Sequence, residues 1–390
     1  MKIAILTSHF PPRWGGISRY TYEIASHWKQ HGADILVAST VPPGEASDRL
    51  SAEFDGQYTY LPYSKGGYWH ALLVIREFVR WTKEEGADLV FFPYWYPFAL
   101  FAPFFPSILR RYIVGTHGAE VLKLLNPERN IHGIIHWLGC HLLRNAKAVF
   151  VVSNYTAKQL EELHIASDRI HVFPNGVDHT VFRPQSVSKE DLFRKYSVQN
   201  PTAPVLLTVA QLNPRKGIDI TLEAVARLHQ EGRELSYVII GRGNDEQRLR
   251  EIIVERDLQE TTYIFTDVDD ESLLKFYNVA DIFVMLSRKE GAENVEGFGI
   301  SLLEANACGL PVIGGRSGGV PDVVVDGETG YLLDPTDTGM LESTIHYLLD
   351  HPEKAEQLGR QGRKRVVDQY NWHHITRNML SLLENIKTEL

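Results

Sequence analysis

Residues 282–304 read IFVMLSRKEGAENVEGFGISLLE, an order that predicts a strand, a loop and the start of a helix. The apolar run Ile282–Met285 has the length of a buried strand, and Ile300–Ala307 is the predicted helix. Gly297 and Gly299 carry no side chain that would cover the backbone amides at the helix N-terminus. The free N–H groups and the dipole at such a terminus favour a phosphate or the hydroxyls of a sugar.

Two carboxylates, Glu296 and Glu304, bracket this terminus and are eight positions apart. Each can accept a pair of hydrogen bonds from a vicinal diol. Taken alone, a pair of this kind is more often part of an ordinary surface helix with a capping glutamate. The pair therefore gains weight only from other polar or glycine-rich strand ends in the same half of the chain.

Such strand ends are present. Arg215 and Lys216 follow the apolar run Val205–Val209, and this pair suits a diphosphate because Arg binds it as a fork and Lys as a point charge. Gly241 ends the next predicted strand, and Gly318–Gly319 follow a later one. Together these positions predict a site for a nucleoside diphosphate.

The alternation of short apolar strands and amphipathic helices runs along the whole chain and predicts α/β architecture with parallel sheets. The polar segment Arg183–Pro204 separates two sets of such units. We therefore expect two doubly wound, Rossmann-like domains that face each other across a deep cleft. Residues 1–185 with the C-terminal helix 372–390 form the first domain, and residues 186–371 form the second. The predicted strands are Lys2–Thr7, Ile35–Ala38, Leu89–Phe92, Tyr112–Val114, Val149–Val152, Val205–Val209, Tyr237–Ile240, Tyr263–Phe265, Ile282–Met285 and Val312–Gly314.

Composition narrows the class of protein. The 390 residues carry a net charge of −9, divided into +2 over residues 1–175 and −11 over the rest, so no basic footprint for nucleic acid is present. The opening MKIAIL reads as a buried strand and not as a signal peptide. Cys140 and Cys308 have no metal spacing and are expected to be free thiols in a reducing compartment, which predicts a cytoplasmic protein.

The run from Glu296 to Glu304 resembles the signature of the retaining glycosyltransferases of family 4, which have the GT-B fold. Further matches follow in the order that is typical of that family. They are Gly15–Gly16, Thr116–His117–Gly118, Val152–Ser153, Pro174–Asn175–Gly176–Val177–Asp178, Arg215–Lys216–Gly217, Ala280–Asp281 and Gly318–Gly319–Val320–Pro321. The resemblance implies a hexosyltransferase that moves a sugar from a nucleoside diphosphate to a hydroxyl of a glycan, lipid or small molecule.

The resemblance also implies roles for single residues. Arg215 and Lys216 would hold the donor diphosphate and neutralise the leaving group. Glu296 would bind the donor sugar together with the amides of Phe298 and Gly299, next to Ile300, while Glu304 would bind the ribose. In the first domain, His117 would face the donor sugar, and Gly15 and Gly16 would let their loop approach the donor phosphate and the acceptor.

Two loops bear on the choice of donor. In place of the glycine that is usual in the family after the strand at Ile264, this chain has Thr266–Asp267. This loop, which includes Val268, would lie close to the base of the donor, so the identity of the base stays undecided. The segment Arg288–Asn294 resembles the extended loop of mannosyltransferases that act on phosphatidylinositol, which favours GDP-mannose.

His132, His136 and His141 lack a carboxylate that would complete a metal site, so they are interpreted as core or interfacial residues. No Asp-x-Asp pair suggests a cation that bridges the diphosphate. Neither a metal nor a cofactor is expected. Catalysis would rest on the fixed cations, with anomeric retention implied by the resemblance.

The aromatic tract Phe91–Phe105 and the predicted loop Tyr58–Trp69 offer surfaces for an acceptor or for peripheral contact with a membrane, although packing in the core explains most of these rings equally well. Two alternatives stay open. One is a sugar-nucleotide epimerase, and the other is a non-catalytic subunit that binds nucleotide sugars on the same fold.

Overall fold

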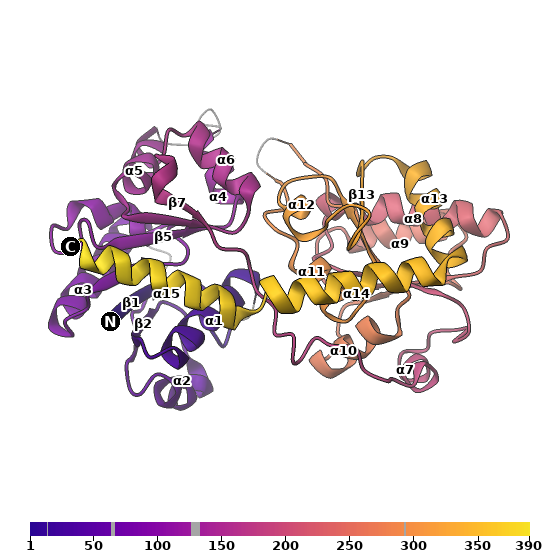
Figure 1. Ribbon diagram of the computed structural model, residues 1–390, viewed down its shortest axis with the longest axis horizontal. Coiled ribbons are helices and arrows are strands. Elements are labelled where there is room, and N and C mark those ends of the chain that lie inside the picture. The colour runs from indigo at the N-terminus through magenta and orange to yellow at the C-terminus, as the bar shows by residue number, and fades with distance from the viewer. Residues whose placement is uncertain (14, 64–66, 126–132, 292–293) are drawn as a thin grey trace. The chain divides into compact units, whose positions relative to one another are not determined.

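The computed structural model describes residues 1–13, 15–63, 67–125, 133–291 and 294–390. These form two compact units, each built as a sheet of parallel strands between helices (Figure 1). Unit 1 contains residues 1–176 and 372–390, and unit 2 contains residues 177–371. The alternation of strands and helices predicted from the sequence is therefore confirmed.

The sheet of unit 1 has the strand order β3-β2-β1-β4-β5-β6-β7. Its interior strand β1 is buried from Ile3 to Leu6, because helices cover both faces of a parallel sheet and leave no solvent-facing side. The strands are β1 (Lys2–Thr7), β2 (Asp34–Ser39), β3 (Tyr58–Tyr60), β4 (Leu89–Phe92), β5 (Tyr112–Thr116), β6 (Ala148–Val151) and β7 (Ile170–Val172).

The last helix of the chain, α15 (Trp372–Thr388), packs against α1 (Gly16–Gln30) in unit 1, where Figure 1 draws it in yellow. Its buried residues, such as Ile375, Met379 and Leu383, recur at a spacing of four and form the face that packs on the unit. The other helices of unit 1 are α2 (Ser47–Glu53), α3 (Gly67–Glu84), α4 (Ala119–Leu125), α5 (Gly133–Asn145), α6 (Asn154–Glu162) and the 3₁₀ turns η1 (Gly44–Ala46), η2 (Phe98–Phe104) and η4 (Ser167–Arg169).

The sheet of unit 2 has the order β10-β9-β8-β11-β12-β13. Its strands are β8 (Val205–Val209), β9 (Ser236–Ile240), β10 (Thr262–Phe265), β11 (Ile282–Met285), β12 (Val312–Gly315) and β13 (Gly330–Leu333). Its helices are α7 (Lys189–Tyr196), η5 (Pro214–Lys216), α8 (Ile218–Gln230), α9 (Glu246–Glu255), α10 (Asp270–Val279), α11 (Ile300–Ala307), α12 (Val320–Val323), α13 (Thr338–Asp350) and α14 (Pro352–Gln369).

Both sheets reverse their winding direction once. In unit 1 the reversal lies between β1 and β4, and in unit 2 it lies between β8 and β11. Loops that leave the carboxyl ends of the two strands at such a point diverge to opposite faces of the sheet and leave room for a ligand. The strand order therefore marks one edge of each unit as the place for a site.

Three strands were missed by the sequence analysis, and all three lie at sheet edges. β3 and β7 have three residues each and are partly exposed, and β13 begins with a glycine. Such strands lack the continuous apolar run that marks a strand buried on both faces. The prediction of a loop over Tyr58–Trp69 was also wrong, because this segment contains β3 and the start of α3, whereas residues 64–66 lie outside the described residues.

The units divide between Gly176 and Val177 and not after residue 185. Backbone contacts explain why residues 177–185 belong to unit 2. The N–H of Val177 donates to the carbonyl of Tyr370 at 2.8 Å, and Arg363 donates to the carbonyls of His179 and Phe182 at 2.9 and 2.7 Å. The polar segment Arg183–Pro204, expected to join the domains, instead contains α7 and is part of unit 2.

Candidate active site

Arg215 and Lys216 lie in a 3₁₀ turn between β8 and α8, at the reversal point of the unit 2 sheet. Pro214 begins this turn, and its fixed φ angle suits the first position of a helical turn. Gly217 ends the turn in the left-handed region, with φ 69°, and starts α8. The short turn directs two cationic side chains toward the neighbouring strand β11.

Glu296 comes from the loop after β11 and meets both cations. Arg215 Nη1 lies 2.7 Å from Glu296 Oε2, and Lys216 Nζ binds the same oxygen. The three side chains are only 11–14% exposed. Sequence analysis assigned Glu296 to the sugar and the cations to the diphosphate, whereas the structure joins all three in one buried cluster.

The cluster is electrostatically unbalanced. Burial raises the pKa of Glu296, but Lys216 and Arg215 outweigh that effect and lower the pKa to about 2. The carboxylate is therefore ionised at neutral pH, and two cations share one anion. Arg215 Nε is buried with no hydrogen-bond partner among the described residues. A net positive charge and an unused donor are what an incoming anion requires.

Glu304 lies on α11, about one turn after the start of the helix, and is 8% exposed. Tyr277 of α10 donates its hydroxyl to Glu304 Oε2 at 2.9 Å. The tyrosine hydroxyl thereby orients the carboxylate of Glu304. This arrangement differs from a solvated helix-capping glutamate, which was the simpler explanation of the sequence.

Phe298, Gly299 and Ile300 form the entry to α11. Gly299 is the N-cap and has φ 105°, and Ile300 is the first helical residue, so the first amides of this helix have no intrahelical acceptor. Phe298 is buried, and its ring packs 6.0 Å from the ring of Tyr370. The N–H of Gly319 donates to the carbonyl of Glu296 at 2.9 Å and holds the loop from the other side.

Gly241 ends β9 at the same edge of the sheet, where a Cβ atom would come 1.8 Å from the carbonyl oxygen of Ala210. Only glycine fits this close approach of two backbones. The next residue, Arg242, donates to the carbonyl of Thr266 and pairs with Asp267 at 2.9 Å. Arg242 thereby joins the loop of Gly241 to the loop in which the half-buried Val268 lies.

In unit 1, His117 follows β5, and aromatic rings from α1 and from the segment after β4 pack against it. The ring of Tyr20 meets the imidazole edge-on at 4.8 Å, and the ring of Tyr94, two residues after β4, lies at 6.4 Å. His9, two residues after β1, packs on Tyr94 at 5.0 Å. Sequence analysis did not identify His9, although its place directly after the first strand was a usable signal.

The imidazole of His117 is held in one orientation. Its Nε2 lies 2.9 Å from the carbonyl oxygen of Pro93, which can only accept, so Nε2 carries the proton and Nδ1 is the acceptor nitrogen. Burial lowers the pKa of His117 to about 4, so the ring is neutral at pH 7. The buried carboxylate of Glu120 accepts the backbone N–H of His117 and fixes the turn after β5.

Gly15 and Gly16 lie at the start of α1, after β1. Gly15 is the N-cap, and both residues are exposed. A Cβ atom on Gly15 would meet no atom within 4 Å, so the described residues leave open space at this point. In unit 1, Gly15, Gly16 and His117 follow β1 and β5 at the carboxyl edge of the sheet, while the other predicted site residues belong to unit 2.

The remaining predictions concern histidines and metals. His136 and His141 lie on α5 and are partly exposed, and His141 stacks on Trp137 at 5.1 Å. His132 lies outside the described residues, as do residues 292 and 293 of the extended loop. Among the residues that the structure describes, no group of three His, Cys, Asp or Glu side chains is arranged to hold a metal ion.

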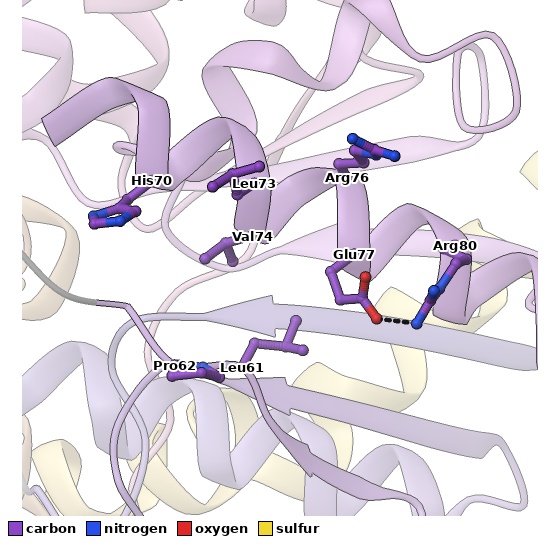
Figure 2. A pocket seen from close by; sticks show the side chains of 8 residues that line it. All are labelled: Leu61, Pro62, His70, Leu73, Val74, Arg76, Glu77 and Arg80. Carbon is purple, nitrogen blue, oxygen red and sulfur yellow. Dashed lines mark hydrogen bonds and ion pairs between the residues drawn. The ribbon is translucent and has the colours of Figure 1, made fainter. Parts of the chain in front are cut away.

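A pocket of about 390 Å³ lies beside α3 in unit 1 (Figure 2). Glu77 and Arg80 form an ion pair along one side of it. Its lining residues are Leu61, Pro62, His70, Leu73, Val74, Arg76, Glu77 and Arg80. The pocket combines apolar groups with charged groups of both signs. No helix in the described part of the chain is long and apolar enough to cross a membrane.

Of the aromatic tract, Phe91, Phe92 and Phe98 are buried in the core, whereas Tyr96 and Phe104 are exposed.

Relatives of known function match nearly the whole chain. The GDP-mannose-dependent alpha-(1-6)-phosphatidylinositol monomannoside mannosyltransferase of Mycolicibacterium smegmatis is 29% identical over 370 residues, which cover 94% of each chain. The GDP-mannose-dependent monoacylated alpha-(1-6)-phosphatidylinositol monomannoside mannosyltransferase of Corynebacterium glutamicum is 26% identical over 386 residues and 98% of each chain.

Solved structures share the fold. A glycosyltransferase from Rickettsia africae superimposes with a TM-score of 0.79 at 22% identity, over 99% of this chain and 98% of its own. Anabaena HepE, solved in complex with UDP and glucose, gives 0.80 at 18% identity, over 99% of this chain and 100% of its own.

Two family models match successive parts of the chain and leave few residues outside. The model of Glycosyltransferase Family 4 matches residues 14–181, and the model of Glycosyl transferases group 1 matches residues 189–365. Together with the two parallel sheets and the buried cluster at the reversal point of the second, they show that this chain is a glycosyltransferase of family 4 with the GT-B fold.

Proposed function

We propose that this glycosyltransferase transfers mannose from GDP-mannose to a hydroxyl group, with retention of the anomeric configuration and without a metal ion. The observation that carries the proposal is the buried cluster of Arg215, Lys216 and Glu296 at the reversal point of the unit 2 sheet. The choice of GDP-mannose rests on the printed names of the relatives that match 94–98% of the chain.

The cluster suits a leaving nucleoside diphosphate. As the glycosidic bond breaks, negative charge grows on the diphosphate, and Arg215 and Lys216 stand ready to meet it. Cations that are already fixed in a poorly solvated site need no reorganisation during the reaction. When the diphosphate takes over the two cations, Glu296 becomes available to accept hydrogen bonds from the sugar.

Independence of metal follows from the same chemistry. Fixed guanidinium and ammonium groups perform the charge stabilisation that a divalent cation provides in other transferases. Without a covalent glycosyl-enzyme intermediate, retention of configuration requires the acceptor hydroxyl to approach on the face from which the diphosphate leaves.

Unit 1 is the proposed acceptor side. His117 is neutral at pH 7 and has Nδ1 as its acceptor nitrogen, so it can receive a hydrogen bond from a sugar hydroxyl. The relatives act on phosphatidylinositol mannosides by name, which favours an acceptor with a lipid anchor. Gly15, the N-cap of α1, leaves open space for such an acceptor.

Helix α3 is the proposed contact with a membrane. Trp69, Leu73, Arg76 and Arg80 recur at helical spacing and are exposed, with Trp69 79% exposed. An exposed aromatic ring beside cations is typical of a surface that inserts a ring among anionic headgroups. Two free, buried cysteines fit the reducing environment of the cytoplasm, where the inner membrane face would lie. Co-sedimentation with anionic and neutral vesicles, compared between the protein and Trp69→Ala, tests this contact.

The epimerase alternative is less well supported. It needs a carboxyl group that can donate and accept protons beside the sugar, whereas the pKa of Glu296 is lowered to about 2 by Lys216 and Arg215 despite its burial. A carboxylate held this way is a poor proton donor at neutral pH. A non-catalytic binding subunit would be expected to have lost one of the two cations or one of the two glutamates, whereas this sequence keeps all four residues.

Incubation with a panel of UDP-, GDP- and ADP-sugars distinguishes these functions. Slow release of GDP and mannose from GDP-mannose supports the proposal, a new sugar epimer indicates an epimerase, and unchanged donors indicate a binding protein. A thermal-shift panel with free GDP, UDP and ADP identifies the base independently, because a nucleotide at about 100 times its dissociation constant adds roughly 2.7 kcal/mol of stability.

A further inference from the structure

The loops after β8 and β11 touch at a second place, outside the cluster of Arg215, Lys216 and Glu296. The N–H of Arg288 donates to the carbonyl of Arg215 at 2.8 Å. A Cβ atom on Gly217 would lie 2.2 Å from the carbonyl oxygen of Leu286. The backbone that carries the two cations is therefore packed directly on the backbone that leads to Glu296.

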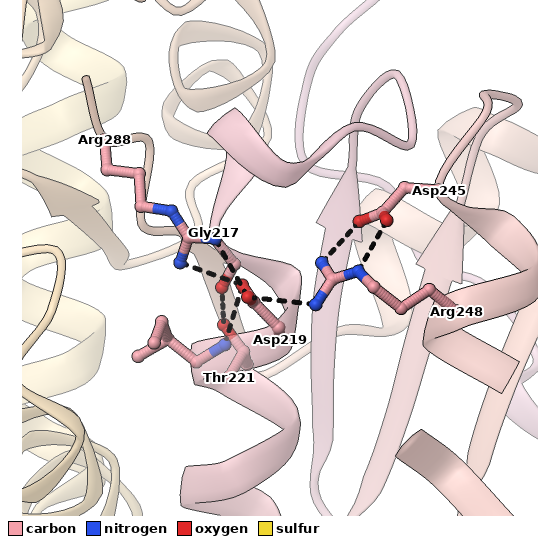
Figure 3. Close-up of polar contacts among 7 residues, drawn as sticks. Gly217, Asp219, Thr221, Asp245, Arg248 and Arg288 are labelled. Carbon is pink, nitrogen blue, oxygen red and sulfur yellow. Dashed lines mark hydrogen bonds and ion pairs between the residues drawn. The ribbon is translucent and has the colours of Figure 1, made fainter. Parts of the chain in front are cut away.

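The side chain of Arg288 reinforces this contact. Its two terminal nitrogens reach both carboxylate oxygens of Asp219, at 3.0 and 2.8 Å (Figure 3). Asp219 lies in the first turn of α8, directly after the turn of Arg215 and Lys216. Both side chains are about four-fifths buried, at 21% and 18% exposed. A two-pronged arginine–carboxylate contact fixes orientation as well as distance.

A second arginine completes the network. Arg248 of α9 contacts Asp219 at 3.4 Å and holds the buried Asp245 through two hydrogen bonds of 2.6 Å (Figure 3). The hydrogen bond with Asp245 and the charge of Asp219 raise the pKa of Arg248. Two arginines meet two aspartates, so this network is balanced, in contrast to the cluster of Arg215, Lys216 and Glu296.

We propose that Asp219 and Arg288 are a positioning pair for the donor site. They clamp the turn of Arg215 and Lys216 to the start of the loop that carries Glu296. Because its charge is matched by Asp219, Arg288 acts through its neighbours and does not contact the diphosphate. This role rests on the proposed function of the cluster, but the clamp itself can be observed without donor turnover.

The experiment compares Arg288→Gln, Arg288→Lys and Asp219→Asn with the parent protein. Hydrogen exchange is read at the amides of Lys216 and Gly217, which donate within the clamped turn. Exchange should accelerate at least tenfold in Arg288→Gln and less in Arg288→Lys, which keeps the charge. For GDP-mannose hydrolysis, kcat should fall by about tenfold to a hundredfold, the size of loss expected when reacting groups are misplaced by 1 Å. The double variant Asp219→Asn/Arg288→Gln should lose no more than one single variant, because both act through one contact.

Arg233→Gln is the matched control, since Arg233 pairs with Asp350 beyond the other end of α8. It should leave exchange at Lys216 and Gly217 and the value of kcat unchanged. Equal effects of Arg233→Gln and Arg288→Gln, or additive losses in the double variant, would overturn the positioning role. Faster exchange without donor turnover in any protein, the parent included, would support the clamp and contradict the proposed function instead.

Discussion

Replacing Glu296 with Gln removes the only carboxylate in the described residues that contacts both Arg215 and Lys216. The two cations lower the pKa of Glu296 from 4.5 to about 2, against the effect of burial, which corresponds to roughly 3 kcal/mol in favour of the ionised folded state. We expect Glu296→Gln to lower the free energy of opening of unit 2 by about that amount at pH 7. A cost of about 3–5 kcal/mol is usual when one partner of a buried ion pair is removed.

The pKa shift of Glu296 also predicts how its contribution to stability changes with pH. The pKa of Glu296 is lower in the folded state, so its stabilisation is complete above pH 4.5 and disappears as the pH falls toward 2. The difference between the parent protein and Glu296→Gln should therefore shrink with acid, to about half at pH 3.

Hydrogen exchange at the slow amides of β8 and β11 measures this difference for unit 2 alone, which matters because two units can unfold separately. The matched control is Glu356→Gln, which breaks an exposed ion pair with Arg360 and should cost less than about 1 kcal/mol.

Nucleotide binding distinguishes a role of Glu296 at the donor site from a role in the stability of unit 2 alone. GDP supplies negative charge to the same two cations, so Glu296→Gln should bind free GDP at least as tightly as the parent protein, while turnover of GDP-mannose falls. The reasoning fails if the variant loses affinity for GDP, or if its stability is the same as that of the parent protein at pH 7.

Three further outcomes are expected. Glu304→Gln should weaken the binding of free GDP by about 1.5–3 kcal/mol, as measured by calorimetry. Tyr277→Phe, which removes only the hydroxyl that orients Glu304, should weaken it less. Equal affinities for GDP in the parent protein and both variants would contradict the assignment of the ribose to Glu304. His117→Ala should fold and bind GDP but lose most transfer in a radiolabelled mannose assay, and a fully active or unfolded variant would make His117 a core residue. Full activity is expected in excess EDTA, and activity that EDTA abolishes and magnesium restores would refute the metal-independent mechanism. Arg215→Ala and Lys216→Ala should each lower kcat by roughly 10²–10³. The double variant should lose less than the product of these two losses, because both cations serve one diphosphate.

Most of the fold was predictable because parallel strands that are buried on both faces have continuous runs of apolar residues in the sequence. β1, β4, β8 and β11 were predicted with the bounds that the structure has. The edge strands β3 and β7 were not predictable in this way, because each has only three residues and is partly exposed to solvent. The division between the units was also misplaced, since the polar segment after Val177 is held by carbonyl contacts that no local pattern records.

The sequence by itself determined the class of the protein and the identity of its candidate cations and carboxylates, because glycines, charges and strand ends follow one another within short stretches. Only the tertiary structure decided which of them meet. Arg215 and Glu296 are 81 positions apart, yet parallel pairing of β8 with β11 brings their side chains to 2.7 Å. Asp219 and Arg288 meet for the same reason, 69 positions apart. Contacts of this kind depend on strand order, and strand order is set by how the helices and sheets of the whole unit pack, which no single stretch of sequence encodes.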